Sequence, residues 1–101
     1  MTDRPRRVVD DASRHRFLIT QDGLEAELVY RVEGGRLDVV HTYVPPALRG
    51  RGVAGRLVRA AAERAQRTGE TIVPTCPFAR RWLQRHPDAA AGVTIDWGTD
   101  R

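Results

Sequence analysis

The first half of the chain has the alternation of apolar and polar residues that is typical of antiparallel strands. Residues 24–32 show it most clearly, and the apolar run 17–19 and the mostly apolar segment 37–44 are also predicted to be strands. The polar residues 21–23 and the pair Gly34 and Gly35 separate these segments and are typical of tight turns. The third segment ends at Pro45, because proline has no amide hydrogen to contribute to a ladder. The pattern therefore predicts a meander of β-hairpins.

In the second half of the chain the apolar residues follow a helical period. From residue 53 to residue 65 they share one face of a helix, which is expected to end at Thr68 and Gly69. Residues 71–74 form a short apolar run that predicts one more strand. A second helix is expected from Pro77 to about His86, with a further helical turn before Val93.

The predicted order of elements is β-β-β-α-β-α, which indicates an α+β fold with a mixed sheet and helices packed on it. The 101 residues, of which 41% are hydrophobic, suffice for one modest core. Residues 1–14 are expected to be a partly disordered lead-in, since they offer little besides Val8 and Val9 to bury. The domain is expected to span residues 15–93, followed by a tail at 94–101.

Charge and composition narrow the function classes. The 17 basic residues exceed the 13 acidic ones and give a net charge of +4, and residues 49–67 hold six arginines against one acid, Glu63. This excess favours a polyanionic partner near that segment. No apolar run is long enough to span a membrane, and residues 1–11 are too polar for a secretory signal, so we expect a cytoplasmic protein with no membrane partner. The single cysteine, Cys76, excludes an internal disulfide and a cysteine cage for zinc, and we expect no metal site.

The segment from Val44 to Gly55 is a strand end followed by a glycine-containing loop and the start of a helix. The first turn of a helix presents unpaired amides at the positive end of its dipole and suits an anionic phosphate. Gly50 and Gly52 let the backbone approach such a group, and Arg49 and Arg51 supply forked donors for its oxygens. The alternative to a phosphate-binding site is that this segment is only a connecting loop with surface arginines.

Three phosphate-binding motifs compete for this loop. A Walker A loop is excluded because Gly55 is followed by arginine and leucine. The residues Gly50, Gly52 and Gly55 match the dinucleotide fingerprint, but no acidic residue closes the next strand and the chain is too short for a doubly wound sheet. The third motif is arginine or glutamine, two residues, glycine, one residue, then glycine or alanine. Arg49, Gly52 and Ala54 satisfy it.

With this third motif the chain resembles the GNAT superfamily of acetyl-CoA-dependent N-acetyltransferases, which carry it between a central strand and the next helix. Other segments extend the resemblance over residues 8–93: Phe17 with Asp22-Gly23, Leu28-x-Tyr30, His41-Thr42-x-Val44-Pro45, Pro74-x-Cys76-Pro77 and Trp82-x-x-x-His86-Pro87. In this order and spacing they are similar to the small, single-domain GNAT-like proteins.

The resemblance implies a compact GNAT-like fold whose two central strands, here 37–44 and 71–75, splay apart so that the pantetheine of acetyl-CoA inserts between them. It implies that residues at the strand end, loop and helix start bind this coenzyme: Thr42, Val44, Arg49, Gly50, Arg51, Gly52, Val53 and Ala54. A backbone amide within residues 42–44 is then placed to stabilise the thioester oxygen as it gains charge.

Transfer of an acetyl group to an amine also requires proton handling, for which His41 and Cys76 are the candidates. Histidine ordinarily titrates near neutral pH, so His41 suits a general base. Strand alternation places it on the face of Leu37, Val39 and Tyr43, so the alternative is a buried histidine bonded to backbone. Cys76 is a candidate nucleophile, an acid for the leaving sulfur, or an inert packing residue.

The sequence thus predicts an N-acetyltransferase that moves an acetyl group from acetyl-CoA to a primary amine. Because the chain passes directly from its lead-in into hairpins, the acceptor cleft should be open, which favours a protein or peptide amine. We expect a monomer or a weak dimer. Two alternatives stay open: an acyl-CoA-binding protein without catalysis, and an arginine-rich nucleic-acid-binding module. Two features weigh against the nucleic-acid-binding module: alanines lie between the arginines of the helix, and the aromatic residues form no stacking platform.

Overall fold

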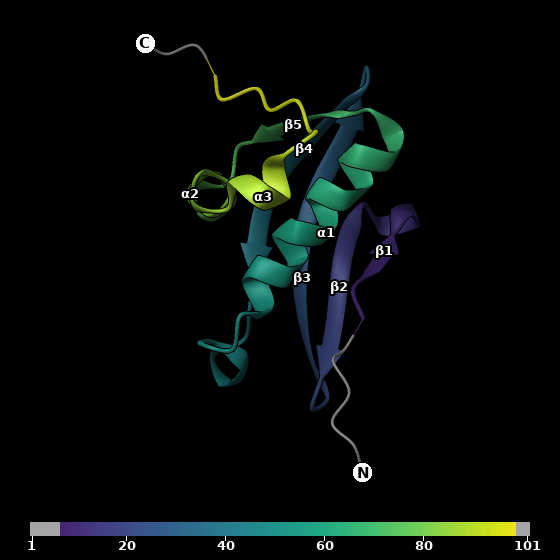
Figure 1. Ribbon diagram of the computed structural model, residues 1–101. Coiled ribbons are helices and arrows are strands. Elements are labelled where there is room, and N and C mark those ends of the chain that lie inside the picture. The colour runs from purple at the N-terminus through teal and green to yellow at the C-terminus, as the bar shows by residue number, and fades with distance from the viewer. Residues whose placement is uncertain (1–6, 99–101) are drawn as a thin grey trace.

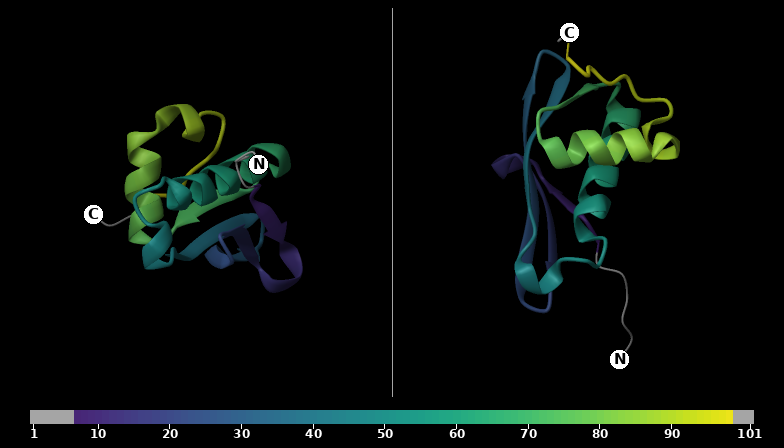
Figure 2. Two further views of the ribbon diagram at one scale, coloured as in Figure 1. Left: turned by 90° about the horizontal axis from the view of Figure 1, so that it is seen from below. Right: turned by 90° about the vertical axis from the view of Figure 1, so that its left-hand side faces the viewer.

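The computed structural model describes residues 7–98, which form one five-stranded sheet with all three α-helices on the same face (Figures 1 and 2). The strands are β1 (Val9–Asp11), β2 (Arg16–Gln21), β3 (Leu24–Glu33), β4 (Arg36–Tyr43) and β5 (Thr71–Pro74). The helices are α1 (Val53–Thr68), α2 (Pro77–Arg85) and α3 (Pro87–Ala90), with 3-10 turns η1 (Ala12–Arg14) and η2 (Pro46–Leu48). The predicted α+β class and the order of elements are confirmed.

The strands lie in the sheet in their order along the chain, β1 to β5. Neighbours from β1 to β4 are antiparallel, as short hairpin turns require. β5 is parallel to β4, because α1 crosses over the sheet between them. The loop that runs from the end of β4 to the start of α1 is part of this crossover. It is the loop that contains the phosphate-binding motif.

A β-bulge interrupts β4 just before its end. Val29 pairs with His41 while the next residue, Tyr30, pairs with Val39, so Val40 is an extra residue on β4. The bulge reverses the alternation beyond it: His41 is exposed and Thr42 is half-buried. The expectation that His41 shares the buried face of Val39 is therefore wrong, because one inserted residue moves all later side chains to the opposite face.

The ladder between β4 and β5 covers only the first half of β4. It ends with the pair Val39 and Pro74, after which the Cys76 amide donates to the Val39 carbonyl at 2.9 Å. Within the described part of the chain, residues 40–43 then have no strand partner on the β5 side. The predicted splaying of the two central strands is thus present, with Cys76 at the point where they separate.

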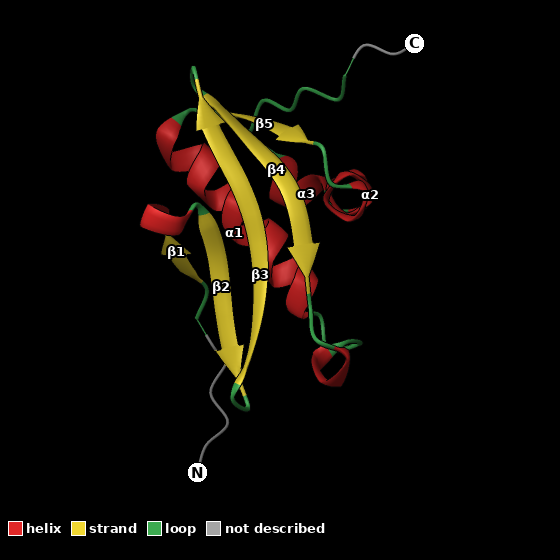
Figure 3. Cartoon of the chain, turned by 180° about the vertical axis from the view of Figure 1, so that it is seen from behind, coloured by secondary structure: helices red, strands yellow, loops and turns green. Residues whose placement is uncertain are grey.

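The core lies between the sheet and α1. Leu57, Val58 and Ala61 of α1 are fully or almost fully buried, and Leu28 and Val39 face them from the sheet side of the core. Burial of each leucine or valine contributes about 1.5–3 kcal/mol, so this face holds α1 in place. No helix of the described chain covers the opposite face of the sheet (Figure 3).

Ordered elements also lie on both sides of residues 15–93. Residues 9–14, expected in the lead-in, form β1 and η1, and Val9 pairs with Leu18 of β2. Near the other end, Ile95 makes a parallel bridge with Ile72 of β5. Residues 1–6 and 99–101, which belong to the predicted lead-in and tail, lie outside the described residues.

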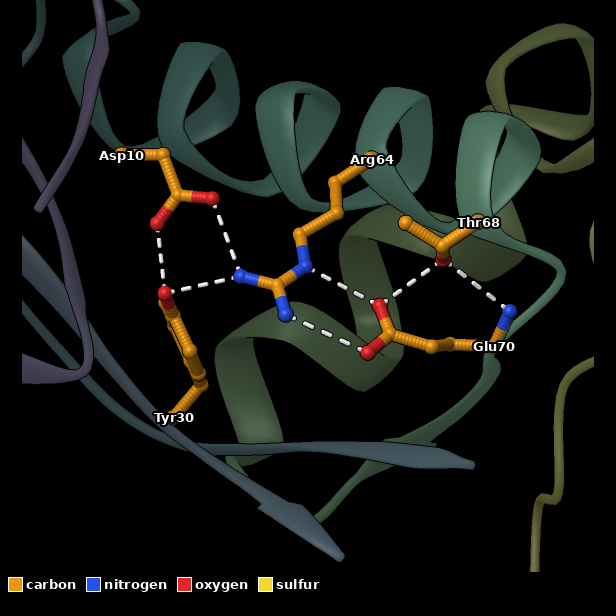
Figure 4. A network of polar contacts seen from close by, with 5 residues as sticks. All are labelled: Asp10, Tyr30, Arg64, Thr68 and Glu70. Carbon is orange, nitrogen blue, oxygen red and sulfur yellow. Dashed lines mark hydrogen bonds and ion pairs between the residues drawn. The ribbon is translucent and has the colours of Figure 1, made fainter. Parts of the chain in front are cut away.

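A polar network around Arg64 joins β1 and β3 to the end of α1 (Figure 4). The Arg64 guanidinium donates to Asp10 at 2.9 Å and to the Tyr30 hydroxyl at 2.8 Å, and grips both oxygens of Glu70 at 3.0 and 3.2 Å. Burial and the hydrogen bond to Asp10 raise the pKa of Tyr30 to about 12. The hydrogen bond from Arg64 lowers the pKa of Glu70. The network explains how the short, charged β1 is fixed to the sheet.

Candidate functional site

A pocket of about 440 Å³ lies where β4 ends and α1 begins. Six of the eight residues that the sequence predicted as coenzyme-binding line it: Val44, Arg49, Gly50, Gly52, Val53 and Ala54. Thr42 and Arg51 are the two that do not. The loop and the helix start therefore come together as one concave surface.

The start of α1 presents uncapped amides to this pocket. The first hydrogen bond within the helix runs from the Arg56 amide to the Gly52 carbonyl at 3.1 Å, which leaves the amides of residues 53–55 without a partner inside the helix. No side chain of the described residues caps them, and the first turn has no acidic residue. The positive end of the helix dipole is thus free to attract an anion.

The backbone at Gly52 accounts for the open approach to these amides. Its φ of +76° is a left-handed conformation that side chains with a β-carbon adopt at a cost of about 1–2 kcal/mol. A β-carbon added at Gly50 or Gly52 would meet no heavy atom within 4 Å, so the space above both glycines is empty. The backbone at these two positions is therefore accessible to a bound group.

The two loop arginines differ in their positions. The Arg49 Nε atom donates to the Val44 carbonyl at 2.9 Å, which folds the side chain back over the pocket that it lines. Arg51 lies 3.4 Å from the Asp22 carboxylate in the turn between β2 and β3. Arg49 therefore adds positive charge to the pocket, while Arg51 connects the loop to the hairpin.

The far wall of the pocket is apolar and comes from α2. Phe78 and Trp82 are half-buried: they pack against the hydrophobic core and also line the pocket. The Trp82 ring stacks on His86 at a centroid distance of 3.9 Å, and the His86 Nδ1 lies 2.7 Å from the Trp82 carbonyl. His86 also ends α2, as predicted. The one-turn spacing of residues 78 and 82 was the signal that they share a face, but the sequence did not show that this face borders a pocket.

Cys76 occupies the split in the sheet. It precedes α2 as the N-cap, its side chain is 5% exposed, and its Sγ lies 3.5 Å from the Thr42 hydroxyl of β4. The contact with Thr42 thus bridges the two strands where their backbones separate. His41 is next to Thr42 but exposed on the opposite face, so the structure brings Thr42 and Cys76 together and separates His41 from the thiol.

The described residues contain no group of three or more histidine, cysteine or acidic side chains arranged to hold a metal ion. Of the helices described, none combines the length and the apolarity needed to cross a bilayer.

The fold is an α+β sheet that splits between β4 and β5, with a pocket at the uncapped start of α1 and a buried thiol in the split. Residues 16–92 match the family model described as GCN5-related N-acetyl-transferase, and the chain belongs to this family. The resemblance inferred from the sequence is thereby confirmed.

Relatives and a solved structure agree with this assignment. Protein NATD1 of mouse and that of human are each 34% identical over 86 residues, which cover 82% of this chain and 78% and 76% of those proteins. An NMR structure of a GCN5-like protein from Staphylococcus aureus superimposes with a TM-score of 0.68 at 26% identity and covers 94% of this chain and 91% of its own.

Proposed function

We propose that this protein is an acetyl-CoA-dependent N-acetyltransferase that moves an acetyl group to a primary amine on a protein or peptide. The observation that carries the proposal is that the pocket at the uncapped start of α1 is also lined by Val44, just after β4, and by Phe78, two residues after Cys76. Acetyl-CoA is an extended ligand with a diphosphate near one end and a thioester at the other. The helix start would hold the diphosphate, and the split would hold the thioester.

The pocket residues fit the parts of acetyl-CoA. The amides of residues 53–55 and the Arg49 guanidinium would hold the diphosphate. Leu48 and Phe78 offer an apolar wall to the pantetheine, and the unpaired edge of residues 40–43 offers backbone groups to its amides. When bound, acetyl-CoA supplies the acetyl group as a thioester.

Cys76 and Thr42 are the side chains that the split brings together. If Cys76 is the nucleophile, its sulfur takes the acetyl group as the coenzyme thiol leaves, and the amine then displaces Cys76. If the amine attacks directly, the Cys76 thiol is placed to give a proton to the departing thiolate. In both routes the Thr42 hydroxyl orients the sulfur through their 3.5 Å contact.

His41 is the proposed base for the incoming amine. Its exposure on the helix-free face of the sheet allows it to exchange protons with solvent and with an acceptor that arrives there. Because the described chain has no element over that face, a peptide or a protein surface can reach it without opening the domain. An enclosed pocket for a small amine would require such a cover.

The proposal is tested with the purified protein in low salt. Titration with acetyl-CoA, followed by calorimetry, should give a saturable complex. Mass spectrometry of a peptide with a free amine should show that an acetyl group has replaced one hydrogen of the amine. Absence of binding by folded protein would overturn the proposal. Binding without transfer to any amine would identify an acyl-CoA-binding protein without catalysis.

A further inference from the structure

Arg56 and Arg59 lie on the part of α1 that separates two pockets. Both residues line the pocket at the start of α1, and both also line a second pocket of about 320 Å³ between α1 and the segment that enters β1. A ligand that fills the first pocket therefore meets these two guanidinium groups where it leaves the loop.

The second pocket has an excess of positive charge. Its charged lining residues are Arg7, Asp10, Arg56, Arg59, Glu63 and Arg67. The Asp10 carboxylate is already bound by Arg64 and by the Tyr30 hydroxyl, which leaves Glu63 as the one acid on this lining outside the Arg64 network. The pocket therefore attracts an anion.

The side chains of Arg56 and Arg59 are available to bind an anion. Among residues 7–98, none of the ion pairs involves Arg56. Arg59 pairs with Asp88 at 3.6 Å, but both side chains are exposed, so water screens the attraction. Its guanidinium also lies 5.3 Å from the centre of the Trp82 ring, which restricts where the side chain can point.

The spacing along α1 suits a second phosphate close to the first. Arg56 and Arg59 follow Val53 by three and six residues, which places them about 4.5 and 9 Å further along the helix axis. In coenzyme A the diphosphate and a single phosphate are attached to the 5′ and 3′ positions of the same ribose. If the diphosphate binds at the start of α1, the 3′-phosphate on the same ribose therefore lies within reach of the Arg56 and Arg59 side chains.

We infer that Arg56 and Arg59 bind the 3′-phosphate of coenzyme A and make the protein select the coenzyme over its 3′-dephospho form. The inference rests on the proposed function, because it assumes that the diphosphate occupies the start of α1. It adds a specificity determinant that lies outside the loop motif.

The test compares coenzyme A with 3′-dephospho-coenzyme A in binding to the unmodified protein. Loss of charge-assisted hydrogen bonds to one phosphate is expected to weaken binding at least about tenfold. In the double variant R56Q/R59Q the two ligands should bind equally, with the affinity for the dephospho form within about twofold of that of the unmodified protein. The matched control R81Q/R85Q removes two exposed arginines of α2 that line neither pocket, and should keep the full preference.

Equal affinity of the unmodified protein for the two ligands would overturn the inference and leave the proposed function intact. A preference that persists in R56Q/R59Q would also overturn it, because other residues would then hold the phosphate. Failure of both ligands to bind would overturn the inference together with the proposed function. Equal affinity combined with binding of a short DNA duplex that R56Q/R59Q abolishes would assign these arginines to a polynucleotide instead.

Discussion

Gly55 of α1 packs directly against Trp82 of α2: a β-carbon on residue 55 would lie 2.5 Å from the indole Nε1 atom. The absence of a side chain at this position lets the two helices approach and places the indole in the wall of the pocket at the start of α1. The third glycine that matched the dinucleotide fingerprint therefore serves helix packing in this structure.

The substitution Gly55→Ala should destabilise the protein, although alanine favours a helix over glycine by about 1 kcal/mol. Overpacking against Trp82 costs about 1–3 kcal/mol, so we expect a net loss of about 1 kcal/mol in the free energy of unfolding. Urea titration measures it, and fluorescence in a Trp97→Phe background reports the displaced Trp82. A more stable variant with unchanged fluorescence would show that the contact is looser than 2.5 Å implies.

The substitution Gly52→Val should abolish or strongly weaken binding of acetyl-CoA. The valine adds its side chain to the empty space above the α1 amides and strains a backbone with φ of +76°. We expect at least about a tenfold increase in Kd for a folded variant, measured by calorimetry. Gly34→Val is the control, since Gly34 also has a positive φ and open surroundings but lies in the turn between β3 and β4. Normal binding by Gly52→Val would refute the assignment of the loop.

The substitution Cys76→Ala distinguishes the two chemical routes. If Cys76 takes the acetyl group, the variant should bind acetyl-CoA normally but lose about 10²-fold or more in kcat. Mass spectrometry of the unmodified protein, quenched without an acceptor, should then show one acetyl group on Cys76. Unchanged turnover in Cys76→Ala would make the thiol a packing residue beside Thr42.

The substitution His41→Gln tests the base on the helix-free face. We expect kcat to fall by about 10²-fold, while the affinity for acetyl-CoA stays the same. Rates are measured at saturating coenzyme. A variant that turns over as fast as the unmodified protein would remove His41 from the mechanism.

The ion pair between Glu70 and Arg64 should make stability depend on pH in the acidic range. The folded state lowers the pKa of Glu70 below its ordinary value of 4.5, chiefly through the hydrogen bond from Arg64. The contribution of this group is therefore present above pH 4.5 and is lost as the pH falls through the lower, folded pKa. Glu70→Gln should lower the free energy of unfolding by about 2 kcal/mol at neutral pH and lessen its fall in acid.

Glu63→Gln, on α1, is the control for Glu70→Gln, which lies just after this helix. Glu63 is exposed and takes part in none of the ion pairs among the described residues, so its substitution should leave the acid dependence unchanged. Equal acid sensitivity of Glu70→Gln and the unmodified protein would show that Glu70 contributes no pH-dependent stability.

Much of the fold could be predicted from the sequence because strand and helix periods are local properties. The alternation in residues 24–32 and the shared apolar face from residue 53 to residue 65 are set by neighbours in the chain. The loop motif was readable for the same reason, since a glycine-containing turn and the helix that follows are continuous in sequence. β1 was missed because its charged residues are stabilised by Arg64, 54 positions away from Asp10.

The sequence by itself determined the meander, the position of α1 and the exposed backbone of its first turn. Only the tertiary structure decided which residues meet. The bulge at Val40 places His41 on the exposed face, and the early end of the β4–β5 ladder leaves Cys76 beside Thr42. The missing side chain at Gly55 lets Trp82 line the pocket. These outcomes depend on pairing and packing between segments far apart in the chain. The contacts that stabilise these arrangements join distant segments, so no local pattern of residues predicts them.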